Sequence, residues 1–206
     1  LLLLFIMVFN IISKGIPNEL VIANTCPVIK SINNNNVILR EDTLYSFKNA
    51  ESGWQMNTKG AGTANGTNIN LYPVDFSAPV TQRYAITVVS ESDGTFMLSP
   101  SYDKTKFLDV SGTEFAVGKG IVLWNADGDP LKELKLEYLP DGSVFIVFAA
   151  YPDYCIGAAS KTAARTTQKQ LVVCKKTGEA NQRWVICDEN GLELNNSVSN
   201  TRTYNM

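Results

Sequence analysis

The sequence contains no histidine among its 206 residues. Histidine is the commonest general base at neutral pH, and it activates the serine or cysteine nucleophile in most covalent catalysis. Its absence excludes Ser–His–Asp and Cys–His catalysis and every zinc site with imidazole ligands. The four cysteines form no Cys-x-x-Cys pair, which removes the usual remaining zinc motif. We therefore expect no metal site, no cofactor and no enzymatic activity.

The sequence also lacks an excess of positive charge. Lysine and arginine number 18 and the acidic residues number 20, which gives a formal net charge of −2. The two signs are interspersed, without a long run of either. Proteins that bind nucleic acid carry a basic surface, so we expect no nucleic-acid partner.

A membrane-spanning helix is a third feature that is missing. The apolar run at residues 1–12 is shorter than the roughly 20 residues that a span needs. Its length is that of a signal-peptide core, and Ser13 and Gly15 supply small residues of the kind that signal peptidase prefers. We expect residues 1–15 to be a signal peptide, the protein to be secreted and extracellular, and no stable membrane span. The alternative is an apolar strand or interfacial anchor that the mature chain keeps.

Short strand-like runs alternate with turn signals from Thr43 onward, and no long helical period competes with them. Each turn signal pairs an Asp or Asn with a glycine, which supplies the positive φ that a tight hairpin turn requires. The pattern predicts an all-β protein. The turn signals are Asp93-Gly94, Asp127-Gly128, Asp141-Gly142 and Asn190-Gly191.

The sequence repeats itself with a period of about 50 residues. Steps of 15, 10 and 2 residues connect Gly157, Val172, Gln182 and Trp184. The same steps connect Asn57, Tyr72, Gln82 and Tyr84, and then Asp109, Trp124, Leu134 and Leu136. A fixed period is the signature of repeated supersecondary units, so we expect a pseudo-threefold architecture.

Each repeat closes on a residue that we expect to be structural. Trp184 would bury a large indole in a small core, and Gln182 carries the donors and the acceptor that can tie a neighbouring loop to its strand. We expect a structural role for five residues, namely Gln82, Tyr84, Leu136, Gln182 and Trp184.

This constellation resembles the ricin-type lectin domain, a β-trefoil whose three repeats each close on a Gln-x-Trp-like motif. The resemblance covers roughly residues 40–194 and is strongest in the third repeat. It implies a β-trefoil over residues 43–194, with repeats at about 43–95, 96–147 and 148–194. Residues 16–42 would form an N-terminal strand or extension tied to this domain, and residues 195–206 a polar tail.

The four cysteines allow three pairings, and cysteine use of this kind favours an oxidising compartment. The resemblance implies a disulfide between Cys155 and Cys174, which would leave Cys26 to pair with Cys187. Two sequons, at Asn65 and Asn195, would be glycosylated if the chain passes a suitable secretory pathway.

The resemblance also implies sugar sites in which an aromatic ring stacks on the sugar while a carboxylate and an amide bind its hydroxyls. In the third repeat Gly157 and Val172 remove the carboxylate and the ring, although Asn181 keeps the amide. We expect the second repeat to be the best site, for a galactose-like sugar. The matching residues are Asp109, Trp124 and Glu133 in the second repeat, and Asn57, Tyr72 and Thr81 in the first.

The expected function is therefore a secreted carbohydrate-binding module with glycans or glycoproteins as partners. Because a single shallow site binds weakly, self-association or another secreted protein is a further expected partner. The alternative is a structural or interaction protein on a lectin scaffold that has lost sugar binding, such as an extracellular coat or invasion-structure component or a cell-binding toxin subunit. A Kunitz-type inhibitor would need an exposed reactive loop, and we do not find one in the sequence. The acidic residues Asp127, Asp129 and Glu133 could in principle supply a carboxylate pair for glycoside hydrolysis, but we interpret them as a solvated loop.

Overall fold

The computed structural model describes residues 37, 39–75 and 79–194 of the chain. Within these residues no helix has the length and apolar character needed to cross a bilayer. Several parts of the chain for which we stated expectations lie outside the described residues. They are the signal peptide, most of the N-terminal extension, Cys26, Asn195 and the polar tail. The described strands are β1 Leu44–Asn49, β2 Gln55–Thr58, β3 Ile69–Tyr72, β4 Tyr84–Ser90, β5 Thr95–Pro100, β6 Lys106–Val110, β7 Ile121–Asn125, β8 Leu134–Tyr138, β9 Val144–Phe148, β10 Tyr151–Gly157, β11 Val172–Lys175 and β12 Trp184–Asp188.

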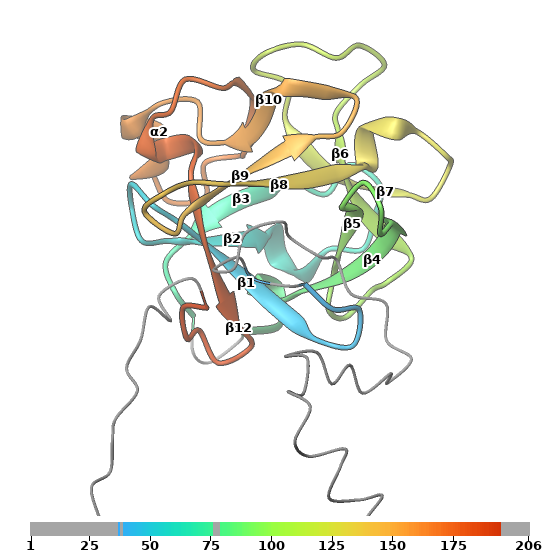
Figure 1. Ribbon diagram of the computed structural model, residues 1–206, viewed down its shortest axis with the longest axis horizontal. Coiled ribbons are helices and arrows are strands. Elements are labelled where there is room, and N and C mark those ends of the chain that lie inside the picture. Colours follow the sequence, from blue (N-terminus) through green and yellow to red (C-terminus); the bar gives the residue numbers. More distant parts are fainter. Residues whose placement is uncertain (1–36, 38, 76–78, 195–206) are drawn as a thin grey trace, which may run out of the picture.

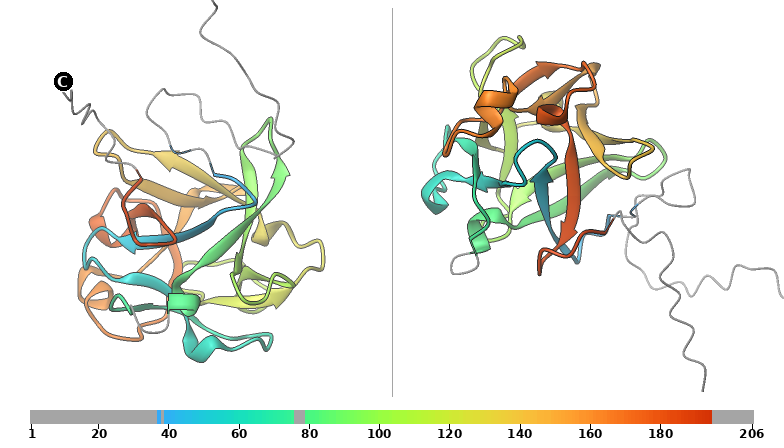
Figure 2. Two further views of the ribbon diagram at one scale, coloured as in Figure 1. Left: turned by 90° about the horizontal axis from the view of Figure 1, so that it is seen from below. Right: turned by 90° about the vertical axis from the view of Figure 1, so that its left-hand side faces the viewer.

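Six strands form a closed barrel (Figure 1). Strand β1 pairs with β12 and β4, β5 pairs with β4 and β8, and β9 pairs with β8 and β12, all antiparallel. The first and last strands lie side by side in Figures 1 and 2, which closes the ring. Closure gives every barrel strand a paired neighbour on each side.

The other six strands form three hairpins, β2–β3, β6–β7 and β10–β11. The hairpins meet through the isolated bridges Asn68–Val122, Asn70–Gln170 and Gly120–Val172, so each one contacts the other two. Three units of four strands, built as a barrel with three hairpins, make a β-trefoil. The all-β, pseudo-threefold prediction is confirmed.

One buried side chain from each repeat occupies the same place in the barrel core. Tyr84, Leu134 and Trp184 each begin a strand at a constant spacing of 50 residues, and all three are at most 1% exposed. Leu136, which we predicted for this place in the second repeat, is only partly buried against the core. The fixed spacing misplaced it because the second repeat reaches its buried residue two positions earlier than the other two.

The two glutamines of the closing motifs tie loops as predicted. The Gln82 side chain donates to the carbonyl oxygen of Pro73 at 2.8 Å and accepts from the backbone N–H of Asp75 at 3.0 Å. Gln182 donates to the carbonyl oxygen of Lys175 at 3.0 Å and accepts from the N–H of Thr177 at 2.9 Å. Each amide satisfies the backbone of the loop that follows a hairpin, and so fixes that loop against the barrel.

Three of the four predicted Asx-Gly turns are present, at Gly94, Gly142 and Gly191, whose N–H groups close turns on Glu91, Leu139 and Asp188. Asp127-Gly128 instead lies in the irregular connection between β7 and β8, which do not pair with each other. Gly94, Gly128, Gly142 and Gly191 all have positive φ, between 65° and 82°. A residue with a Cβ adopts this backbone region only at a cost, which explains why glycine stands at these positions.

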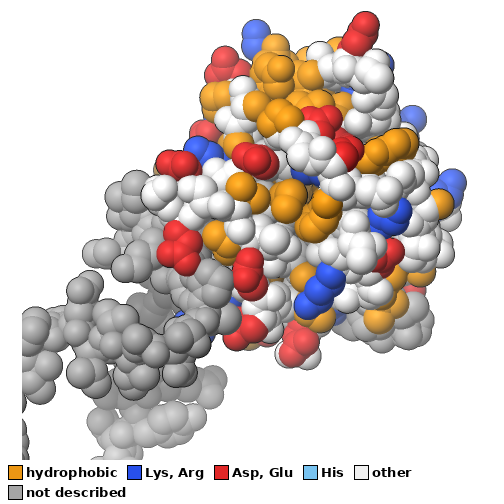
Figure 3. All heavy atoms as spheres, turned by 90° about the vertical axis from the view of Figure 1, so that its right-hand side faces the viewer, with side chains coloured by type: hydrophobic (Ala, Val, Ile, Leu, Met, Phe, Trp, Pro, Cys, Tyr) orange, Lys and Arg blue, Asp and Glu red, His pale blue; other side chains and the backbone are white. Residues whose placement is uncertain are grey.

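The connection between β6 and β7 packs on the third repeat through an aromatic cluster. The Phe115 ring stacks on Tyr151, with centroids 4.2 Å apart, and meets Phe148 and Tyr154 edge-on. Hydrophobic side chains gather at the upper end of the face shown in Figure 3, where this connection and β10 lie in Figure 1. The contact fixes the second hairpin relative to the third.

The predicted disulfides are not formed in the structure, where Cys155, Cys174 and Cys187 are free and buried. Cys155 and Cys174 stand directly opposite each other on β10 and β11. The Cys174 thiol, however, donates to the carbonyl oxygen of Ala158 at 3.6 Å. Burial raises the pKa of Cys155 to about 12 and that of Cys174 to about 11.

We expect the folded, unreduced protein to resist alkylation by iodoacetamide at pH 8, because the thiolate is the reactive species and burial keeps these thiols protonated. After unfolding in guanidinium chloride, Cys155, Cys174 and Cys187 should each take up one label by mass spectrometry. A peptide pair joined through Cys155 and Cys174 in the unreduced digest would contradict this result and restore the disulfide.

Candidate functional site

The first two hairpins each place a polar residue and a ring on one face. Asn57 pairs with Asn70 in the first repeat, and Tyr72 lies two residues further along β3. Asp109 pairs with Val122 in the second, and Trp124 lies two residues further along β7. Residues in this diagonal relation share one face of an antiparallel pair. The structure therefore brings Asn57 beside Tyr72, and Asp109 beside Trp124.

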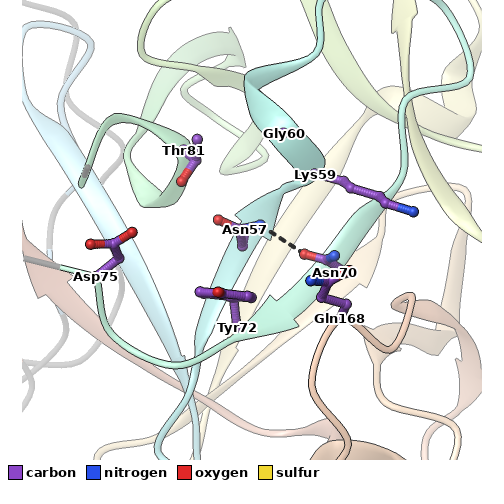
Figure 4. Close-up of a pocket in the computed structure, with 8 residues that line it drawn as sticks. All are labelled: Asn57, Lys59, Gly60, Asn70, Tyr72, Asp75, Thr81 and Gln168. Atoms are coloured by element: carbon purple, nitrogen blue, oxygen red, sulfur yellow. Dashed lines mark hydrogen bonds between the residues drawn. The ribbon is translucent and has the colours of Figure 1, made fainter. Parts of the chain in front are cut away.

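In the first repeat this face opens into a pocket of about 400 Å³. The structure brings together all three residues that we predicted for this repeat, namely Asn57, Tyr72 and Thr81, and adds five others (Figure 4). The added residues are Lys59, Gly60, Asn70, Asp75 and Gln168.

Asn57 lies in the middle of the pocket, next to Tyr72 (Figure 4). Its amide group donates to Oδ1 of Asn70 at 2.8 Å, and this bond orients Oδ1 of Asn57 toward the side on which Asp75 and Thr81 lie. Asn57 is 7% exposed, so its orientation is fixed by its surroundings. The arrangement offers a hydroxyl-bearing ligand one oriented carbonyl acceptor, a hydroxyl group and a carboxylate beside an aromatic ring.

Sequence reasoning missed Asp75, which supplies the carboxylate that Asn57 lacks. One signal pointed to it, since Asp75 stands in the loop that a closing glutamine is expected to tie, and its N–H does donate to Gln82. Gln168 had no such signal, because it comes from the third repeat and reaches this pocket only through the fold.

In the second repeat the Asp109 carboxylate is already occupied. It is 7% exposed, its Oδ1 accepts from the N–H of Val110 at 2.7 Å, and its Oδ2 lies 2.7 Å from the Lys132 ammonium group. Trp124 is 41% exposed and free to stack on a ligand. The ring that we predicted is available here, but both carboxylate oxygens are engaged within the protein.

Lys132 stands where Gln82 and Gln182 stand in the other repeats, 50 residues from each. It is 1% exposed, and its ammonium group also contacts Oδ1 of Asp127 at 2.6 Å. Burial alone lowers the pKa of Lys132, but the two carboxylates outweigh burial and raise the pKa. A charged lysine therefore ties the loop in the second repeat, as an amide does in the other two.

Glu133 does not occupy the amide position that we predicted for it. It follows the short 3-10 helix Pro130–Lys132 and ends it by donating its N–H to the carbonyl oxygen of Pro130. The residue that precedes Lys132, as Thr81 precedes Gln82, is Leu131. The second repeat therefore lacks a polar side chain at this position.

The third repeat has lost its site by backbone packing. A Cβ on Gly157 would lie 2.9 Å from the Gln182 Cα atom, so the backbone fills the space used by Asn57 and Asp109 elsewhere. Gly157 pairs with Val172, and the ring position two residues further along β11 is therefore Cys174 rather than Val172. The Asn181 amide donates to the carbonyl oxygen of Ala158 at 2.7 Å and is 4% exposed.

The described residues hold no group of three His, Cys, Asp or Glu side chains that could bind a metal ion. The pocket of the first repeat contains a single carboxylate, that of Asp75. What this pocket can do chemically is bind a polar ligand through hydrogen bonds and ring stacking.

The family model described as "Ricin-type beta-trefoil lectin domain-like" matches residues 35–124, which include both hairpins that carry a ring. This stretch of the chain is thus similar to the ricin-type domain, and the chain as a whole has the β-trefoil fold. The sequence has no match among curated proteins.

Solved structures share the fold of this chain. The designed threefold-symmetric protein ThreeFoil matches with a TM-score of 0.62 and 20% identity, over 70% of this chain and 98% of that one. The Macrolepiota procera ricin B-like lectin, solved with lactose, matches with a TM-score of 0.56 and 16% identity, over 70% of this chain and 94% of the lectin. The exo-β-1,3-galactanase 1,3Gal43A from Clostridium thermocellum matches with a TM-score of 0.63 and 17% identity, over 74% of this chain and 32% of the enzyme.

Proposed function

We propose that this protein is a non-catalytic carbohydrate-binding module that binds β-galactosides in the pocket of its first repeat. The observation that carries the proposal is the convergence of Asn57, Tyr72 and Thr81 on one pocket, with Asp75 added. The Tyr72 ring stacks on the apolar face of the sugar, and the Asn57 carbonyl and the Asp75 carboxylate accept from its hydroxyls. Lactose in the Macrolepiota procera lectin supports the choice of a galactoside.

The first repeat is a better site than the second because its acceptors face the pocket. In the second repeat a sugar hydroxyl would have to displace Lys132 from Asp109, and that would leave a buried charge unpaired. Trp124 alone offers a stacking surface without the hydrogen bonds that give orientation and specificity.

Replacing Tyr72 with alanine is expected to weaken lactose binding at least tenfold, because the ring that stacks on the sugar is removed. A factor of ten corresponds to about 1.4 kcal/mol of binding free energy. Isothermal titration calorimetry on the full chain measures the change. Tyr72→Phe keeps the ring and should retain most of the affinity, and Trp124→Ala should leave it unchanged. Loss of binding in Trp124→Ala with full binding in Tyr72→Ala would move the site to the second repeat.

The second candidate function is a structural or interaction protein that keeps the trefoil without sugar binding. It is favoured by the loss of two of the three sites, through Lys132 in the second repeat and through backbone packing at Gly157 in the third. Absence of binding by the folded protein on a broad glycan array would select this candidate, and crosslinking in the native setting would then identify its partner.

We also propose that the protein is secreted and meets its glycans or glycoproteins outside the cell, alone or through self-association or a second secreted protein. The apolar run at residues 1–12 supports export. Fusing residues 1–15 to a reporter and assaying the culture medium for the cleaved reporter tests it. Retention of the reporter inside the cell would contradict secretion through this segment.

A further inference from the structure

The pocket of the first repeat extends beyond the residues that the proposed sugar contacts use. Asp75 and Thr81 lie on one side of Asn57 and Tyr72, while Lys59, Asn70 and Gln168 lie on the other (Figure 4). The pocket of about 400 Å³ thus has polar side chains on both sides of its central ring, and the proposed sugar contacts leave those of the second side unused.

Asn70 carries an unused donor on this second side. The residue is 1% exposed, its Oδ1 accepts from Asn57, and its Nδ2 has no hydrogen-bond partner among the described residues. A buried amide N–H without a partner costs free energy that the fold has to offset. An acceptor oxygen from a ligand on this side would satisfy it.

Gln168 brings the third repeat to the same place. Its φ is 59°, in the left-handed region that residues with a side chain rarely adopt. Its N–H donates to the carbonyl oxygen of Leu71 at 2.9 Å, and the N–H of Leu71 donates to the carbonyl oxygen of Lys169 at 3.0 Å. These backbone hydrogen bonds attach the loop to β3 and hold the Gln168 side chain at the pocket, despite the unfavourable backbone conformation.

The loop can reach the first repeat because the third hairpin is longer. Gly157 and Cys174 are 17 residues apart, whereas Asn57 and Tyr72 are 15 apart. The connection contains a short helix, α2 Lys161–Ala164, and then the segment that runs along β3. The extra length thus adds one side chain, that of Gln168, to the site of another repeat.

We propose that this pocket binds two linked sugar units, with the second unit lying against Asn70 and Gln168 and so bridging the first and third repeats. The inference rests on the proposed function, since it assumes that the first unit stacks on Tyr72. The Asn70 amide donates to a hydroxyl or acetamido oxygen of the second unit, and the Gln168 amide serves as donor or acceptor beside it. Specificity for the second unit then comes from Gln168.

The test compares methyl β-D-galactoside with lactose by calorimetry on the full chain. The wild type should bind lactose at least tenfold more tightly. Gln168→Gly, which removes the side chain and suits the positive φ, should bind both ligands with the affinity that the wild type shows for the methyl galactoside. Asn70→Asp, which keeps the acceptor for Asn57 and removes the donor, should also lose the lactose preference.

Ala61→Gly is the matched control, because Ala61 is the other non-glycine residue with positive φ in the described part of the chain and it does not line the pocket. It should keep the lactose preference. Equal affinity of the wild type for the two ligands, or an intact preference in Gln168→Gly, overturns the two-unit site and leaves the proposed function standing. Failure of the folded wild type to bind either ligand overturns both.

Discussion

Replacing Lys132 with methionine is expected to lower the free energy of unfolding by about 3–5 kcal/mol. Methionine fills a similar volume but leaves the Asp109 carboxylate, which is 7% exposed, without its partner at 2.7 Å. The loop that contains Asp127 loses the same anchor. Urea unfolding followed by tryptophan fluorescence measures the change at pH 7.

Lys161→Met is the matched control, since it makes the same replacement in an ion pair that is open to solvent. Lys161 and its partner Glu179 have side chains that are 61% and 52% exposed. Exposed pairs contribute about 0–1 kcal/mol, so this variant should unfold nearly as the wild type does.

The double variant Lys132→Met with Asp109→Leu separates the unpaired charge from lost packing. Replacing both partners by apolar groups of similar size removes the buried charge, and much of the lost stability should return. A Lys132→Met variant that unfolds within about 1 kcal/mol of the wild type would show that water reaches Asp109. In that case the second-repeat carboxylate would be open to a sugar after all.

The all-β fold and its threefold symmetry could be predicted from the sequence because they depend on local signals that recur along the chain. Asx-Gly pairs mark the ends of strands by their backbone requirement, and Tyr84 and Trp184 mark the barrel core of the first and third repeats by their size. The sequence did not indicate Leu134 as the core residue of the second repeat, because leucine is common and Lys132 replaces the glutamine of the closing motif. A lysine can replace glutamine there only because Asp109 and Asp127 lie next to it, and that contact is made by the fold.

The candidate site was only partly predictable for a related reason. Asn57, Tyr72 and Thr81 follow from the spacing within one repeat, and the structure places them in one pocket. Gln168 is contributed by another repeat, so no spacing within the first repeat indicates it. We expected the second repeat to be the best site because the sequence does not show that Lys132, 23 residues away, lies next to Asp109 and pairs with its carboxylate.

Trp184→Ala is expected to destabilise the protein by about 3–5 kcal/mol through the cavity that it leaves in the barrel. The indole is fully buried, and its N–H donates to the carbonyl oxygen of Ile156 at 2.9 Å. This hydrogen bond links barrel strand β12 to hairpin strand β10. The variant therefore loses packing and also leaves the buried Ile156 carbonyl without its partner. For a domain of this size, the melting temperature should fall by roughly 6–20 °C.

Trp124→Ala makes the same replacement at a residue that is 41% exposed, and its melting temperature should change little. Trp184→Leu then tests the symmetry of the core, because Leu134 already fills the equivalent place in the second repeat. Its loss should be smaller than that of alanine, since leucine refills part of the cavity, although the Ile156 carbonyl stays unpaired. Equal melting temperatures for Trp184→Ala and Trp124→Ala would mean that the third repeat does not depend on the Trp184 indole. The buried residues at 50-residue spacing would then no longer explain the stability of the barrel.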